Sequence, residues 1–184
     1  MNHHDMTRNM VLAALFAALT AIGAFLQIPT GTVPITLQFL FTALAGLLLG
    51  WKWGAVSQLL YVGIGLLGLP VFTQGGGIGY VLQPSFGFLL GLIPAAAVIG
   101  ALTARRTGYL TVLAAGLVGD LILYAVGVPY MYLILHVYMQ SAKTFPALLA
   151  AMLVYVPGDT LKIVVVTALV PVLRRTLAKA VPNL

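Results

Sequence analysis

Six long apolar segments, separated by turns rich in glycine and proline, dominate this sequence. A membrane-spanning helix needs about 20 apolar residues, and each segment reaches or approaches that length. The segments cover residues 7–27, 35–50, 53–69, 84–104, 108–127 and 158–180. Charged residues make up only 7% of the 184, whereas soluble domains are about one quarter charged. The sequence therefore predicts an all-α integral membrane protein, with residues 1–184 in a single transmembrane domain of six helices.

The connections carry turn-forming residues, but one of them is ambiguous. The stretch 27–34 holds two prolines and a glycine, and the stretch 69–84 is dense in glycine. Residues 128–156 predict two short, partly interfacial helices on the outer side, around "HVYMQSAKTFP". Alternatively, the second of these is continuous with the last span, with Pro157 as a kink.

Basic residues predict the orientation, because cytoplasmic loops of membrane proteins are enriched in Lys and Arg. With both termini in the cytoplasm, only Lys143 lies in an outer loop, and Lys162 is buried. The other basic residues then lie inside; they are Arg8, Lys52, Arg105, Arg106, Arg174, Arg175 and Lys179. The sequence thus predicts a multi-pass protein with the loops 27–34 and 69–84 outside. The basic residues form no patch, so nucleic acid is not expected as a partner.

Asp159 and Lys162 are the most informative polar residues, because they open the apolar run "VPGDTLKIVVVTALVPVLRR". A charge inside the bilayer costs about 2.5–3.5 kcal/mol on insertion scales, so such a pair predicts a functional site. Positions three apart share a helix face, so both side chains should point into one pocket. Asp159 follows Pro157, which predicts a position near the helix N-cap. The alternative is an ion pair that only neutralises itself.

Further polar residues are expected at the same depth, in the outer half of the membrane. They are Gln38, Tyr61, Tyr80, Gln83, Ser85, Asp120, Tyr124 and Tyr155. Ligand sites are mostly apolar with a few convergent polar groups, so this set predicts a binding pocket open to the exterior. Alternatively, Gln38 is an interfacial side chain, Asp120 bonds a neighbouring helix, and the tyrosines form an aromatic belt.

Small residues recur at four-residue spacing in the first segment, a pattern that lets membrane helices approach closely. They are Ala13, Ala17 and Ala21, flanked by Ala14 and Ala18. This stripe predicts either an external partner helix or packing within the chain. A glycine series at residues 46, 50 and 54 predicts internal packing.

Motifs for catalysis are missing from the sequence. It has no cysteine and no glutamate, and its acids are Asp5, Asp120 and Asp159. It contains no phosphate-binding loop, no H-E-x-x-H and no G-x-S-x-G. His3 and His4 have no evident partners for a metal site. We therefore expect no enzyme activity, no metal and no cofactor, and active transport would draw energy from another protein or an ion gradient.

Four elements carry a family resemblance: "QIPTGTVPITLQFLFTALAGLLLG", "GAVSQLLYVGIGLLGLPVF", "GGGIGYVLQPSFGFLLG" and "VPGDTLK". Together they resemble the BioY family, the biotin-specific substrate-binding subunits (S components) of energy-coupling-factor (ECF) vitamin transporters. The similarity covers about residues 10–175. Its most specific parts are the combined P-x-T-L-Q and P-G-D-x-x-K elements.

The resemblance implies a six-helix S-component fold in a prokaryotic cell membrane, which captures biotin from outside under the first and third loops. It implies that Asp159 and Lys162 contact biotin. It also implies that the alanine stripe docks a transmembrane coupling subunit, which works with two cytoplasmic ATPase subunits. Two positions depart from the family: residues 83–88 replace a usual G-P-T-G-G-Y, and Asp120 replaces a common Asn. Asp120 is then either protonated or paired with Lys162.

Two other hypotheses are weaker. A stand-alone, proton-coupled vitamin transporter would use Asp120 or Asp159 as a proton relay. Such transporters often contain inverted repeats and broken midplane helices, and the sequence shows neither. A membrane enzyme or assembly subunit is disfavoured because no nucleophile–base or metal motif is present.

Overall fold

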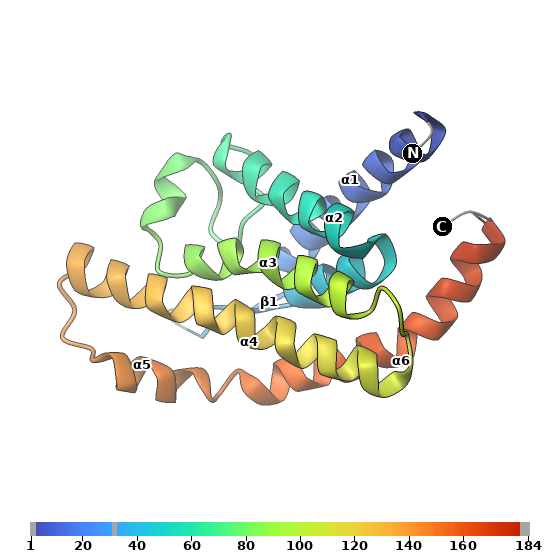
Figure 1. Cartoon of the computed structure of the whole chain (residues 1–184). Coiled ribbons are helices and arrows are strands. Elements are labelled where there is room, and N and C mark those ends of the chain that lie inside the picture. The colour runs from blue at the N-terminus through green and yellow to red at the C-terminus, as the bar shows by residue number, and fades with distance from the viewer. Residues whose placement is uncertain (1–2, 31–32, 181–184) are drawn as a thin grey trace.

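The computed structural model describes residues 3–30 and 33–180, and it is built almost entirely of helices (Figure 1). The α-helices are α1 (His3–Phe25), α2 (Gln38–Leu66), α3 (Phe86–Leu102), α4 (Tyr109–Leu133), α5 (Phe145–Met152) and α6 (Val156–Ala180). The shorter elements are strands β1 (Gln27–Ile28) and β2 (Ile35–Thr36), the 3-10 helix η1 (Ile78–Leu82) and the π-helical turn η2 (Ile134–Tyr138). β1 and β2 pair antiparallel and form a small hairpin after α1.

α2 contains two membrane segments rather than one. Gly50 interrupts the helix with φ 78° and ψ 179°, a backbone conformation that suits glycine. Residues about equally far along the chain before and after Gly50 contact each other. The side chain of Thr42 bonds to that of Gln58, and the side chain of Gln38 bonds to that of Tyr61. The chain therefore reverses at Gly50, and α2 is a hairpin with arms 38–49 and 51–66.

Close contact between these arms depends on Gly46 and Gly54, as predicted, whereas Gly50 of the same series serves the turn, because a Cβ atom there would meet nothing within 4 Å. A Cβ atom added to Gly54 would lie only 2.8 Å from the Cα atom of Gly46. Together with α1, α3, α4 and α6, the two arms give six apolar helical segments within residues 3–30 and 33–180. Helices at Asp5–Phe25, Tyr109–Tyr138 and Val156–Thr176 are long and apolar enough to cross a membrane, α2 reaches that length only over its two arms together, and α3 is a shorter apolar helix. The prediction of an all-α membrane protein is confirmed.

The stretch 128–156 differs from the sequence prediction. α4 does not end at residue 127 but runs to Leu133 and continues through η2 to Tyr138, past Pro129. Proline is tolerated in membrane helices because neighbouring helices and local π adjustments satisfy the freed backbone groups. The first of the two expected short helices is thus part of the fifth span, and the second is α5.

α5 is not continuous with α6, so the alternative of one helix kinked at Pro157 is wrong. Instead, α6 begins at Val156, and Pro157 lies in its first turn. The missing N–H of proline removes no helical hydrogen bond there.

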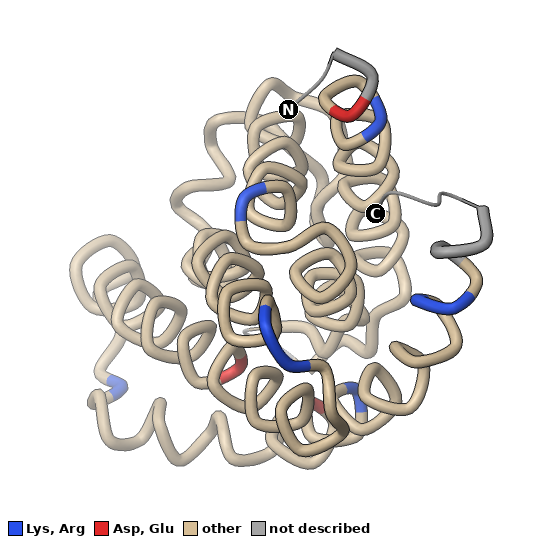
Figure 2. The backbone as a smooth tube through the Cα atoms, turned by 45° about the vertical axis from the view of Figure 1, so that its right-hand side comes forward, with Lys and Arg blue, Asp and Glu red and all other residues tan. Residues whose placement is uncertain are grey.

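The loops between successive helices alternate between the two ends of the bundle (Figure 1). One end holds the turn at Gly50, the α3–α4 turn, the first residues of α1 and the last turns of α6. The opposite end holds the β hairpin, the loop 67–85, the loop 139–144 and α5. We call these the turn end and the loop end. Apart from Lys143 at the loop end and Lys162 within the bundle, the basic residues between residues 5 and 176 gather toward the turn end (Figure 2).

Candidate ligand-binding site

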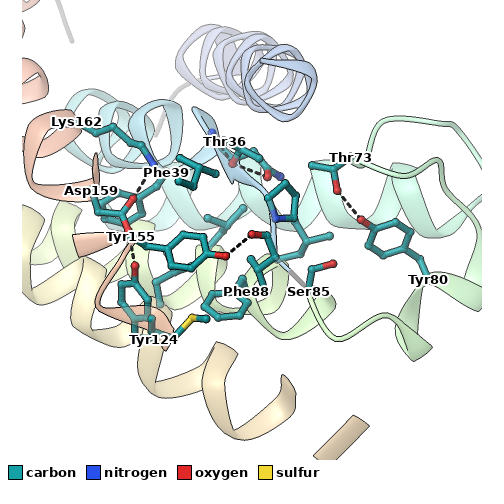
Figure 3. Close-up of a pocket in the computed structure, with 18 residues that line it drawn as sticks. Thr36, Phe39, Thr73, Tyr80, Ser85, Phe88, Tyr124, Tyr155, Asp159 and Lys162 are labelled. Carbon is teal, nitrogen blue, oxygen red and sulfur yellow. Dashed lines mark hydrogen bonds and ion pairs between the residues drawn. The ribbon is translucent and has the colours of Figure 1, made fainter. Parts of the chain in front are cut away.

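A cavity opens at the loop end, between the β hairpin, α2, α3, α4 and α6 (Figure 3). It encloses about 620 Å³ of space between the atoms, its open mouth included. Its apolar lining consists of Val33, Pro34, Ile35, Phe39, Phe88, Leu89, Leu92, Leu123 and Met152. Its polar lining consists of Thr36, Gln38, Thr73, Tyr80, Ser85, Tyr124, Tyr155, Asp159 and Lys162. An apolar chamber with a few polar groups is typical of a small-molecule site.

A charged cluster formed by Tyr124, Asp159 and Lys162 lies on one side of this cavity (Figure 3). The Nζ atom of Lys162 lies 2.6 Å from Oδ1 of Asp159, and the hydroxyl of Tyr124 donates to Oδ2 of Asp159 over 2.5 Å. Asp159 is only 6% exposed and Lys162 only 9%. Lysine has three N–H donors and gives one to Asp159, so two remain for a ligand. We call these three residues the cavity cluster.

Asp159 lies inside the first turn of α6 rather than at its N-cap. Its backbone N–H donates to the carbonyl of Tyr155, which is a helical bond. Its carboxylate faces Tyr124 and Lys162 instead of capping the backbone. The charge is still near the positive end of the helix dipole, which favours an anion there.

Gln38 opens α2 and forms another part of the cavity wall, and its side chain is held at both ends. Its carbonyl oxygen accepts from the hydroxyl of Thr36 at 2.9 Å, and its amide nitrogen donates to the hydroxyl of Tyr61 at 2.8 Å. The hydroxyl of Tyr61 in turn donates to the carbonyl of Val71 at 3.1 Å. Tyr61 does not line the cavity. It supports the site indirectly, because its hydrogen bond with Gln38 fixes the orientation of the Gln38 amide.

Two loops at the loop end are tied to each other and to Tyr155, the residue before α6. The hydroxyl of Tyr155 donates to the carbonyl of Val33 at 2.6 Å (Figure 3). It also bonds to the hydroxyl of Thr30 at 2.8 Å. The hydroxyls of Tyr80 and Thr73 lie 2.8 Å apart. The side chain of Gln27 in β1 donates to the carbonyl of Thr73 at 3.2 Å, which joins the β hairpin to the loop 67–85.

The structure brings most of the predicted site residues to the cavity. Those that line it are Gln38, Tyr80, Ser85, Tyr155, Asp159 and Lys162. Tyr61, Gln83 and Asp120 lie outside the lining. Gln83 follows η1, where its backbone N–H donates to the carbonyl of Tyr80. Lys162 pairs with Asp159, not with Asp120.

Several lining residues did not stand out in the sequence. Thr73 lies in a glycine-rich loop, and no spacing signal marks it. Thr36 is part of the P-x-T-L-Q element, and that element was the one sequence feature that could have pointed to it. Tyr124 appeared only as one of several rings, although its position one helical turn after Asp120 placed it on the same face.

The alanines of α1 divide between two environments. Ala13 and Ala17 are buried inside the chain, at 1% and 4% exposure, while Ala14 and Ala18 are exposed. Ala21 is half-buried. Internal packing therefore accounts for Ala13 and Ala17, whereas Ala14 and Ala18 are exposed on the surface of the described part of the chain.

The BioY family model matches residues 1–179. The chain belongs to the BioY family. A relative from Lysinibacillus sphaericus, named "Probable biotin transporter BioY", is 54% identical over 76% of this chain and 72% of its own length. The biotin transporter BioY of Rhodobacter capsulatus is 42% identical over 97% of both chains. The crystal structure of an S component for biotin from an ECF-type ABC transporter matches with a TM-score of 0.80 and 28% identity over 95% of each chain. The resemblance inferred from the sequence is confirmed, and this BioY-family chain is a multi-pass membrane protein.

Proposed function

We propose that this chain captures biotin with high affinity and serves as the substrate-specific S component of an ECF-type ABC transporter. The observation that carries the proposal is the cavity at the loop end with the buried Asp159–Lys162 pair in its wall. Its BioY relatives are named as biotin transporters, and a solved biotin S component shares its fold. The function is therefore transport, and we place ATP hydrolysis on partner subunits.

The cavity matches the chemistry of biotin. Biotin has a ureido group with two N–H donors and a carbonyl, an apolar bicyclic ring, and an aliphatic tail that ends in a carboxylate. Asp159 offers acceptor oxygens and Lys162 offers two further donors, while Phe39, Phe88 and Leu92 supply apolar wall. Gln38 and Ser85 add polar groups elsewhere in the lining. The proposed ligand contacts are thus Gln38, Ser85, Asp159 and Lys162, with Tyr61 as support.

Equilibrium binding of labelled biotin to the detergent-purified chain tests this function. We expect saturable binding of one biotin per chain, which an excess of unlabelled biotin displaces. Failure of the folded protein to bind biotin would refute the proposal. Reconstitution of the chain alone in vesicles tests the runner-up, because uptake that collapses with a protonophore would favour a proton-coupled transporter.

The exposed half of the α1 stripe is the proposed dock for the transmembrane coupling subunit, which in turn engages two cytoplasmic ATPases. Ala14 and Ala18 are exposed and small, so a partner helix can approach the backbone closely there. Ala18→Phe should abolish co-purification with the coupling subunit and leave biotin binding intact. Ala114→Phe is the matched control, because Ala114 is also an exposed helical alanine, on α4. Equal co-purification of both variants would refute this dock.

The basic residues at the turn end support an orientation with both termini in the cytoplasm. The chain contains no cysteine, so single cysteines can report the side of each loop. In intact cells, an impermeant thiol reagent should label Lys143→Cys and spare Arg106→Cys. The reverse labelling pattern would overturn the proposed orientation.

A further inference from the structure

Asp120 is a half-buried acid that the proposed ligand contacts leave without a role. It lies in the middle of α4, and its Oδ1 atom is buried with no hydrogen-bond partner among the described residues. A buried carboxylate oxygen without a partner is unfavourable, so a second state of this group is to be expected.

The helix geometry places Asp120 beside the cavity cluster. Gly116, Asp120 and Tyr124 follow one another at four-residue steps, so they lie on one face of α4. At one end of this row a Cβ atom on Gly116 would lie 2.6 Å from Cγ2 of Ile163, and at the other end Tyr124 bonds to Asp159. Asp120 therefore faces the part of α6 between Asp159 and Ile163, where Lys162 lies.

The charges near Asp120 do not balance. Asp120 interacts electrostatically with both Asp159 and Lys162, and Tyr124 interacts with Asp120, Asp159 and Tyr155. α3, which packs on the other side of α4, has no ionisable side chain between Phe86 and Leu102. Lys162 pairs with Asp159, so the carboxylate of Asp120 has no cation of its own among the described residues, and the ionised group carries a net charge of −1. A carboxylate ligand would bring it to −2 in a region of low dielectric.

We propose that Asp120 takes up one proton from solvent when a carboxylate ligand enters the cavity, so that ligand binding and protonation of this acid are linked. The proton converts the Asp120 carboxylate to a neutral carboxylic acid, and the net charge of the cluster with its ligand stays at −1. The acid also gains an O–H donor. This inference rests on the proposed function, because it takes biotin, a monocarboxylate, as the ligand.

Calorimetry of biotin binding tests the linkage, with the purified full chain titrated in phosphate and in Tris buffer. These buffers differ in protonation enthalpy, so the difference in binding heat counts the protons taken up. The same titrations at about pH 6 to 9 follow the affinity, with biotin ionised throughout. We expect uptake that approaches one proton per biotin as pH rises, and a Kd that then increases about tenfold per pH unit.

Two comparisons assign the proton to Asp120. Asp120→Asn should bind biotin with no proton uptake and with a Kd that does not vary with pH, while Asp5→Asn, which alters an acid at the turn end, should behave as wild type. Biotinamide, which lacks the negative charge, should bind wild-type protein without proton uptake, and this test needs no variant. Equal heats in both buffers and a flat Kd for wild type would overturn the linkage, as would uptake that persists in Asp120→Asn. Absence of biotin binding at every pH would instead refute the proposed function.

Discussion

Two of the buried polar clusters among the described residues differ in charge and in how fully their hydrogen-bonding groups are paired. The sealed cluster joins α1 to both arms of α2 and consists of Thr20, Thr42, Ser57 and Gln58, each with 0% exposure. Gln58 lies at its centre. Its amide accepts from Thr42 at 2.9 Å and donates to Ser57 at 3.0 Å. The cavity cluster of Tyr124, Asp159 and Lys162 is charged and lines open space.

The difference between these clusters separates a structural role from a binding role. In the sealed cluster the hydroxyls of Thr20 and Ser57 also donate to the carbonyls of Phe16 and Gly54, so neutral groups satisfy one another without a ligand. In the cavity cluster Lys162 lines the cavity and uses one of its three N–H donors on Asp159. Buried charge with spare hydrogen-bonding capacity is what a polar ligand can use. Mutations in the two clusters should therefore change different measured quantities.

The largest effect is expected for Lys162→Met, which keeps the length of the side chain and removes its charge. Truncating one partner of a buried, hydrogen-bonded charge pair at a binding surface costs about 2–5 kcal/mol of binding free energy. We expect biotin affinity to fall by at least about 100-fold in equilibrium binding, since each 1.4 kcal/mol is a factor of ten. Lys143→Met, at an exposed lysine of the loop end, is the control and should bind as wild type. Wild-type affinity in folded Lys162→Met would remove the cavity cluster from the site.

Asp159→Asn should have the next largest effect on binding. The amide keeps the shape of the carboxylate and can still accept from Tyr124, but it loses the charged partner of Lys162. Hydrogen bonds to charged groups contribute about 1.5–3 kcal/mol, so affinity should fall about 10- to 150-fold. The same substitution at Asp5, next to Arg8 at the turn end, controls for the general loss of an acid. An unchanged Kd would mean that the ion pair only neutralises itself.

Gln58→Leu tests the sealed cluster and should change stability rather than affinity. It leaves buried hydroxyl groups short of a partner, at a cost of about 1–3 kcal/mol in the free energy of unfolding. Thermal unfolding in detergent should show a lower midpoint, while the folded fraction should bind biotin within about twofold of wild type. Gln74→Leu, at an exposed loop glutamine, should leave the midpoint nearly unchanged. A large loss of affinity without loss of stability would contradict the division between the clusters.

Tyr155→Phe should have the smallest effect, on the rate of ligand release. It removes the hydroxyl that ties α6 to the first loop through Val33 and Thr30, and one such bond contributes about 0.5–1.5 kcal/mol. Biotin should dissociate about 2- to 10-fold faster in a pulse–chase measurement, with little change in the association rate. Tyr138→Phe, at an exposed tyrosine of the same end, is the control. A slower association with unchanged release would show that Tyr155 does not hold the loop closed.

The membrane fold followed from the sequence because apolar length is a strong signal, and the break between the segments 35–50 and 53–69 matches the reversal within α2. The end of the fifth span did not follow, because the predicted segment ends at residue 127 whereas the helix continues past Pro129. A proline deletes one backbone hydrogen bond, and in a membrane the cost of leaving the helix is larger than that loss. The helix therefore continues to Leu133 and on through η2.

The candidate site was predictable where charge stood against an apolar background. Asp159 and Lys162 stood out for that reason, and the structure pairs them in the cavity wall. Uncharged polar residues gave no comparable signal, because the sequence does not show whether the side chain of a tyrosine or glutamine points into a cavity or away from it. Tyr61 thus lies behind Gln38 instead of in the lining, and Thr73 reaches the cavity from a loop whose path depends on tertiary contacts.

A structure of the chain with biotin bound would show directly whether the cavity cluster holds the ligand. We expect biotin inside the cavity at the loop end, with polar atoms within hydrogen-bonding distance of both Asp159 and Lys162 and with Tyr124 still bonded to Asp159. Biotin bound elsewhere, or in the cavity without contact to either charged residue, would contradict this expectation.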